Sequence, residues 1–142
     1  MRTKLLRPIE NAKIKSETKE AHKNLYEYEP LPDRRSFRLL KLPLLQGNPC
    51  SFVTTSIDNA PPYTTLSYTW GSPIIGVDEQ RYKDAIIPQA ILTTTGKKWI
   101  FTGRNLYDAI CAVTRGRHAK YLWADALCIN QADDAEKDPP DG

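Results

Sequence analysis

Residues 121–131 read YLWADALCINQ. The first four of them, Tyr121 to Ala124, have the apolar and aromatic content of a buried strand. An acid, a thiol and two amides follow directly: Asp125, Cys128, Asn130 and Gln131. Because polar groups are costly to bury without partners, these side chains either line a site or hold a loop in place.

A second run of the same character reads LSYTWG at residues 66–71. Its apolar entry leads to Ser67, Tyr68 and Trp70, and Gly71 closes it. If the two strands are parallel neighbours, both polar clusters lie at the carboxyl edge of one sheet. Ligands bind beyond that edge in open α/β sheets. We therefore predict that the two clusters face each other there.

Each polar residue of the first run also has a structural interpretation. Asp125 can accept backbone N–H bonds or cap the following turn as readily as it can transfer protons. Cys128 stands between two apolar residues and is expected to behave as a small buried hydrophobe. Asn130 and Gln131 are turn residues first and ligand-binding residues second.

A nucleophilic Cys128 would need a basic partner. The two histidines are His22, in the N-terminal segment, and His118, just before the strand and so at its far end. We therefore do not expect a Cys–His pair.

Several strands and one helix can be placed from the residue pattern. Strands are predicted at 36–42, 50–55, 64–68 and 121–124, with further β-rich sequence at 85–94. A hairpin turn at Gly96-Lys97 is predicted to lead into a strand at 98–102. Strand, helix and strand in this order favour a βαβ unit, whose last strand would be parallel and interior.

The fold class is therefore predicted as α/β, with α+β as the alternative. It would contain a mixed, mostly β sheet and a βαβ unit near the C-terminus.

The helix of that unit has clear signals at both ends. Asn105 is predicted to cap it, with Asp108 as a partner three residues on, and Gly116 to lie just past its end. Apolar residues recur at helical spacing between these ends and form one face: Leu106, Ala109, Ile110 and Val113.

Length and composition favour one soluble domain. The chain has 142 residues, of which 40% are hydrophobic and 26% are charged. No run approaches the ~18 apolar residues of a membrane span, and the N-terminus lacks an apolar signal region. Cys50, Cys111 and Cys128 show no CxxC spacing, which favours reduced thiols in a cytosolic or nuclear compartment, and of these we predict a cytoplasmic protein.

Most other site classes are not expected. Much of the +3 charge lies before residue 24, but no aromatic residues alternate with those lysines, so nucleic-acid binding is not predicted. The sequence has no glycine-rich phosphate loop. It also lacks zinc spacing of Cys and His and the alternating acids of a calcium loop. We therefore expect no metal and no cofactor.

Taken together, LSYTWG at 66–71, NLYDAI at 105–110 and LWADALCINQ at 122–131 resemble the heterokaryon incompatibility (HET) domain of fungi. The resemblance covers residues 27–137. Residues 1–26 then form a polar tail or a marginal helix, and residues 138–142 form a tail outside the family pattern. The resemblance implies these characteristic residues: Ser67, Tyr68, Trp70, Gly71, Asn105, Asp125, Cys128, Asn130 and Gln131, with Glu136 at the acidic position.

The resemblance implies a fungal protein of non-self recognition that signals programmed cell death. It would act without catalysis, through self-association or a protein partner. The family is also distantly similar to TIR domains, some of which cleave NAD with a glutamate. An enzyme is therefore the alternative, with NAD bound and Glu136 as the candidate catalytic acid.

The resemblance ends abruptly at the C-terminus. HET domains continue through a helix and a further strand, whereas Pro139 and Pro140 stop the helix here. We therefore expect a partial domain, a truncated fragment whose exposed sheet edge invites a partner chain.

Overall fold

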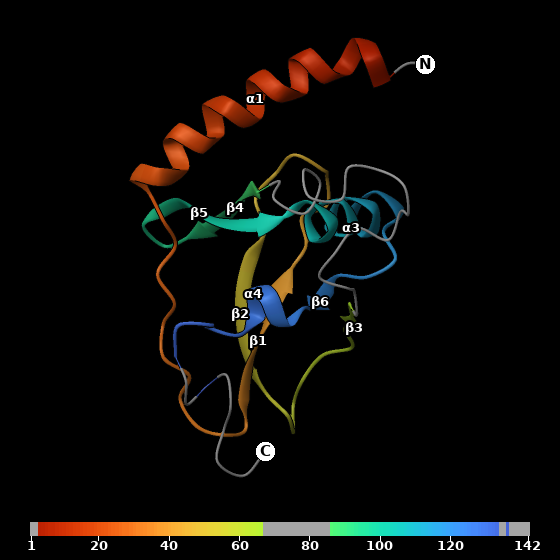
Figure 1. Cartoon of the computed structure of the whole chain (residues 1–142). Helices are drawn as coiled ribbons and strands as arrows, with labels where there is room; N and C mark the ends of the chain where they lie inside the picture. Colours follow the sequence, from red (N-terminus) through yellow and green to blue (C-terminus); the bar gives the residue numbers. More distant parts are fainter. Residues whose placement is uncertain (1–2, 67–85, 134–135, 137–142) are drawn as a thin grey trace, which may run out of the picture.

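The computed structural model describes residues 3–66, 86–133 and 136, with side chains from residue 13 onward. In chain order its elements are α1 (Thr3–Lys23), β1 (Ser36–Lys41), β2 (Ser51–Ser56), β3 (Thr64–Thr65), β4 (Ile86–Thr93), β5 (Gly96–Gly103), α3 (Arg104–Gly116), β6 (Tyr121–Trp123) and α4 (Asp125–Cys128). Figure 1 shows their arrangement.

Within the described ranges, one sheet contains four strands in the order β2-β1-β6-β3. The pairs β2–β1 and β1–β6 are antiparallel, whereas β6 and β3 are parallel, with Thr64 opposite Leu122 and Thr65 opposite Trp123. This mixed sheet, together with the helices, confirms the predicted fold class. It also confirms that β6 is an interior strand with β3 as its parallel neighbour.

A second sheet contains the hairpin β4–β5. Cys50, just before β2, joins it to the first sheet: its N–H donates to Ala90 O (3.1 Å) and its carbonyl accepts from Leu92 N (2.7 Å). On the other side of the hairpin, β5 bonds to the segment after α1, because Tyr26 N donates to Trp99 O at 2.8 Å. Residues 24–26 and Cys50 therefore flank the hairpin.

The predicted βαβ unit is wrong in one respect. The elements β5, α3 and β6 do follow one another. However, β5 pairs with β4 in the second sheet, so β5 and β6 do not share a sheet. The hairpin partner of β5 is separated from it by only a short turn, and this local pairing takes precedence over pairing with β6.

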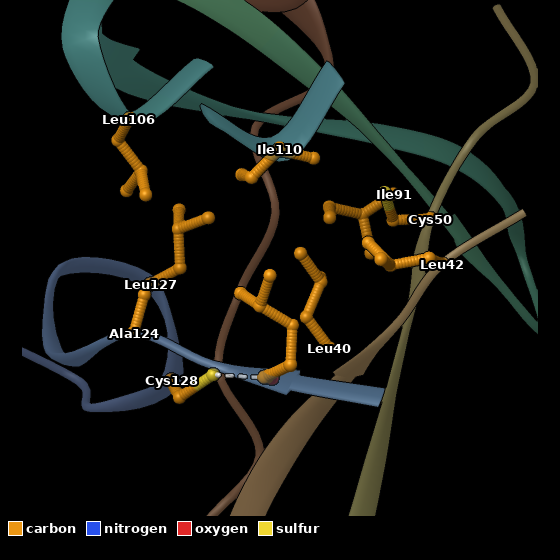
Figure 2. Packing of buried hydrophobic residues seen from close by; sticks show 10 residues of the cluster. Leu40, Leu42, Cys50, Ile91, Leu106, Ile110, Ala124, Leu127 and Cys128 are labelled. Atoms are coloured by element: carbon orange, nitrogen blue, oxygen red, sulfur yellow. Dashed lines mark hydrogen bonds between the residues drawn. The ribbon is translucent and has the colours of Figure 1, made fainter. Parts of the chain in front are cut away.

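The core lies between α3, the two sheets and α4. Leu39 and Leu40 of β1 are both fully buried although their side chains point to opposite faces of the strand, so both faces of β1 are covered. In Figure 2, Leu106 and Ile110 of α3 point toward Leu127 and Leu40. Among the described residues, the buried cluster consists of Leu40, Leu42, Cys50, Ile91, Leu106, Ile110, Leu122, Ala124, Leu127 and Cys128.

The ends of α3 differ from the prediction. The helix begins at Arg104 with Gly103 in the N-cap position and no side-chain cap bond, so Asn105 does not cap it. Asp108 instead pairs with Arg104 across one turn, at 3.4 Å. Gly116 is the last helical residue, and Arg117 takes the left-handed conformation with φ 52°.

The hairpin turn also lies earlier than predicted. Thr94 and Thr95 form it, and Gly96 already belongs to β5 with φ 114°. The Thr93 hydroxyl donates to Gly96 O (2.7 Å) and accepts from Thr95 N (3.2 Å). The end of the turn needs a glycine because the backbone there has a positive φ. Gly96 therefore marks the end of the turn, whereas the prediction took Gly96-Lys97 as its centre and so placed the turn too late.

The N-terminal segment is helical, the second of the two predicted forms. The last turns of α1 attach it to the hairpin. Ala21 is fully buried, the Trp99 indole N–H donates to the Glu20 carboxylate (2.8 Å), and His22 stacks on Phe101 with ring centroids 4.9 Å apart. In the described part of the chain no helix has the length and apolar content to cross a membrane.

Candidate functional site

We call residues 125–131, the polar end of the YLWADALCINQ run, the signature residues. They form the single helical turn α4 and the loop after it, the signature loop. The extended backbone of Ala124 precedes α4, and its carbonyl accepts from Leu127 N (3.1 Å) and Cys128 N (2.8 Å). Leu127 and Cys128 point into the core. Burial of these two side chains fixes the turn. The polar residues Asn130 and Gln131 follow it and are less buried.

Cys128 is a buried thiol. Its side chain is 2% exposed, and its sulfur lies 3.8 Å from Leu122 O, the contact drawn in Figure 2. Burial raises the pKa of this thiol from 9.0 to about 11. His22 stacks on Phe101 and the His118 ring covers Gly116, so neither imidazole serves it as a base. These contacts agree with the interpretation of Cys128 as a small hydrophobe.

Asn130 and Gln131 organise the loop. The Asn130 side-chain oxygen accepts from Ala132 N (3.1 Å), and its carbonyl accepts from Asp133 N (3.0 Å). The Gln131 amide donates back to Asp125 O at 2.8 Å. Both amides therefore have structural uses, whereas Asp125 takes part through its backbone carbonyl.

Arg38, in the middle of β1, is the centre of the site. Only 2% of its side chain is exposed. Its guanidinium donates to Cys128 O (3.2 Å) and Glu29 O (2.6 Å), and forms a two-pronged ion pair with the Glu136 carboxylate. One buried cation thus joins β1, the segment before it and the loop after α4.

Glu136, the candidate catalytic acid, is the anion of this pair. Its side chain is 10% exposed, and its carboxylate also accepts from Asn130 N at 2.8 Å. A buried charge is stable only when it is paired and hydrogen-bonded, and both conditions are met here. The geometry gives Glu136 a structural use that its place in the sequence did not reveal.

Tyr28 completes the cluster. Its hydroxyl donates to Leu127 O (2.5 Å), and its ring lies under the Arg38 guanidinium, 4.8 Å from the ring centroid. Burial raises the pKa of Tyr28 to about 12, although the nearby charge of Arg38 opposes this shift. In Figure 1 the orange segment that carries Tyr28 and Glu29 runs beside the blue loop after α4.

Sequence reasoning missed Arg38 and Tyr28. The available signal was a charged residue in an apolar strand, since Phe37-Arg38-Leu39-Leu40 alternates such that Arg38 shares a face with Leu40. An arginine on the buried face of a strand requires an anion nearby. The pattern did not show that this anion is Glu136.

A cleft of about 550 Å³ adjoins the cluster. Its walls come from the segment before β1, from β1 and β6, and from the loop after α4. Its lining includes Leu31, Asp33, Arg34, Phe37, Trp123, Asp133 and Glu136.

The second motif is only partly visible. Ser67, Tyr68, Trp70 and Gly71 lie outside the described residues. The parallel pairing of β3 with β6 confirms the first condition for the two clusters to meet. Their meeting at the sheet edge stays a prediction. Asn105, in the first turn of α3, is not among the residues that line the cleft.

The described residues offer no metal centre, because nowhere among them do three His, Cys, Asp or Glu side chains gather. Within the same residues, every buried side-chain nitrogen or oxygen atom has a hydrogen-bond partner.

Comparison with known families identifies the family of this chain. The family model described as heterokaryon incompatibility protein (HET) matches residues 63–139, more than half of the chain. The chain belongs to the HET family. All three motifs of the predicted resemblance lie within the matched residues. No curated protein and no solved structure matches this HET chain.

The structural unit extends beyond the HET match. The match begins just before β3, whereas β1 and β2 precede it. Yet β1 lies between β6 and β2, and it carries Arg38, which holds the HET signature loop.

Proposed function

We propose that this HET chain is a non-catalytic binding module of fungal heterokaryon incompatibility. It acts in the cytoplasm, and its association with a protein partner or with itself signals the death of fused cells. Family membership supports a role in heterokaryon incompatibility. The structural use of the signature residues supports binding rather than catalysis.

The observation that carries the proposal is the ion pair of Arg38 with Glu136. The carboxylate faces a guanidinium and a backbone N–H, and it holds the loop that follows α4. The buried thiol of Cys128 and the amides of Asn130 and Gln131 serve the same loop. The most distinctive residues of the chain thus build a rigid element, which is what a module that works by shape requires.

Apolar side chains on the surface support a protein partner. Leu44 and Leu45, between β1 and β2, are 84% and 60% exposed, and they are adjacent in the chain. Exposed apolar residues that lie together are typical of protein-binding surfaces. We infer that this pair forms part of the contact.

The first experiment tests the process. The chain is expressed from an inducible promoter in a filamentous fungus, and dead cells are counted with a vital dye. We expect death on induction, and a loss of that effect in the double variant Leu44→Ser/Leu45→Ser. These side chains are exposed, so the variant should keep the wild-type unfolding curve. Full viability on induction of the wild-type chain would refute the proposal.

The second experiment separates binding from catalysis. Purified protein is incubated with NAD, and NAD loss is followed by chromatography. We expect no loss. Loss that disappears in the variant Arg38→Met/Glu136→Leu would establish the enzyme instead. In that variant two apolar side chains replace the whole buried pair, a change that folded proteins often tolerate.

A further inference from the structure

The cleft beside Glu136 has the size of a small-molecule site. Its volume of about 550 Å³ lies within the range of roughly 300–1,000 Å³ that is typical of ligand pockets. It opens between the segment before β1 and the loop after α4, and the ion pair of Arg38 with Glu136 holds these two walls together.

The lining is largely apolar and includes two aromatic rings. Phe37 is held by Tyr63, with ring centroids 5.6 Å apart, and Trp123 belongs to the interior strand β6. Both side chains are half-buried and line the cleft, as does Leu31. Rings fixed by the sheet offer flat surfaces against which a planar apolar ligand can stack.

The charges of the lining favour a cation. Among the described residues that line the cleft, three are acids, Asp33, Asp133 and Glu136, and one is a base, Arg34. Arg38 behind the wall neutralises Glu136. Asp33, Asp133 and Arg34 are all exposed, which leaves one negative charge in excess among the described lining residues. Aromatic faces attract cations as well, so rings and acids act in the same direction.

We propose that this cleft binds a small organic cation, with a planar apolar body against Phe37 and Trp123 and a positive group near Asp33 and Asp133. Such a ligand would stabilise the contact between the loop after α4 and the segment before β1. This inference is independent of the proposed function, because it rests on the cleft alone.

The test uses three probes with the same naphthalene body: 2-naphthylmethylammonium, the neutral 2-naphthylmethanol and the anionic 2-naphthylacetate. Each is titrated into the full chain by isothermal calorimetry. We expect saturable binding of the cation, with an affinity at least threefold above that of the alcohol. A factor of about this size corresponds to one charge pair separated by ~5 Å in water. The acetate should bind most weakly. No saturable binding of the cation, or tightest binding of the acetate, would overturn the proposal.

Two variants locate the site. Leu31→Trp fills the cleft and should abolish binding of all three probes, whereas Leu44→Trp, on an exposed residue outside the lining, should bind them as the wild type does. Asp133→Asn keeps the oxygen that accepts from Glu136 N and removes one charge. It should lower cation affinity about threefold and leave alcohol affinity unchanged. Unchanged binding in Leu31→Trp, or equal effects of Asp133→Asn on cation and alcohol, would place the probes elsewhere.

Discussion

Arg38 is a cation in the middle of an apolar strand, and all of its hydrogen bonds go to segments outside that strand. It binds Glu29 O, Cys128 O and the Glu136 carboxylate. A buried ion pair need not stabilise a protein more than apolar residues would, but removing one member leaves the other charge unpaired. The pair therefore makes the position of the signature loop dependent on a single contact.

This dependence can be measured with a double-mutant cycle. Arg38→Met and Glu136→Leu should each lower the free energy of unfolding by about 3–5 kcal/mol, because each leaves a buried charge. The double variant should recover most of that loss. Urea unfolding followed by circular dichroism measures all three.

The matched control is Arg35→Met. Arg35 pairs with Asp58 in a bidentate contact of the same kind, but both side chains are about 60% exposed. Water screens such pairs, so little change in stability is expected. If the loss of unfolding free energy in the double variant Arg38→Met/Glu136→Leu equalled the sum of the losses in the two single variants, Arg38 and Glu136 would not stabilise the protein through each other.

The buried thiols predict a loss of stability in alkali. Burial raises the pKa of Cys128 to about 11 and that of Cys50 to about 12. In the unfolded chain a thiol ionises near ~8.5, so above that pH the folded state retains protons that the unfolded state has lost. Stability is complete below this pH and falls as the pH rises toward the folded-state values. Between pH 9 and 10 each thiol contributes a negative slope that approaches about −1.4 kcal/mol per pH unit as the unfolded thiol becomes fully ionised.

Urea titrations at pH 8.5, 9, 9.5 and 10 measure this slope. Cys128→Ala should remove the share of this thiol and leave that of Cys50 and of Cys111, whose pKa burial also raises. Tyr28, whose pKa burial raises to about 12, begins to contribute near pH ~10, where a tyrosine ionises in the unfolded chain, so the thiol is isolated by comparing Cys128→Ala with the wild type at each pH. A slope that is the same in Cys128→Ala and in the wild type would contradict the assignment.

At the scale of elements, the local sequence was a good guide to where strands and helices lie. β-branched and aromatic residues located β1, β2 and β6, and the apolar spacing located α3. The ends were less predictable because neighbouring side chains compete for the same backbone groups. Gly116 illustrates this: the His118 ring occupies the space of its missing side chain, so packing accounts for the glycine and Arg117 takes the left-handed position.

The strand partners were harder to predict than the strands. β5 follows the hairpin rule, but the pairing of β1 with β6 joins Leu40 to Leu122 and has no local signal. The site also lacks a local signal in the sequence, since Arg38 and Glu136 are 98 residues apart in the chain. The sequence pattern favoured a small buried hydrophobe at Cys128 and turn residues at Asn130 and Gln131, but it could not show the cation that holds the loop after them.

The β4–β5 turn allows a clean test of backbone conformation. Gly96 and Gly103 both have open space where a side chain would begin, but only Gly96 has a positive φ, 114°. Gly96→Ala should therefore lower the free energy of unfolding by about 1–2 kcal/mol through backbone strain. Gly103→Ala, the matched control, should lower it less, by about 0.5 kcal/mol, because Gly103 has ordinary extended backbone and loses only the N-cap preference for glycine over alanine. Thermal and urea unfolding of both variants would measure the difference, and equal effects would contradict it.

At the scale of the whole molecule, the family match and the folded unit have different limits. The residues matched as HET begin at 63, yet Leu39 and Leu40 of β1 are fully buried in the common core. A fragment limited to 63–142 would leave β6 without its antiparallel neighbour and Glu136 without Arg38.

We therefore expect the fragment 63–142 to lack a cooperative thermal transition by far-ultraviolet circular dichroism. The fragment 13–142 retains β1, β2 and the attached end of α1, and it should unfold cooperatively. A cooperative transition of the shorter fragment would show that the HET match is a complete folding unit.

Cys50, whose backbone joins the two sheets, also bears on the rate of folding. Its bonds to β4 close a loop of some 40 residues, and the pairing of β1 with β6 closes a loop about twice as long. Chains dominated by distant contacts fold slowly, in milliseconds to seconds. The β4–β5 hairpin can form first, and Cys50 then docks it on the β1–β2 pair. The segment 121–131 bonds to Arg38 and Tyr28, 90 and 99 residues earlier in the chain, so we expect it to become ordered late and the Cys128 thiol to stay accessible until then.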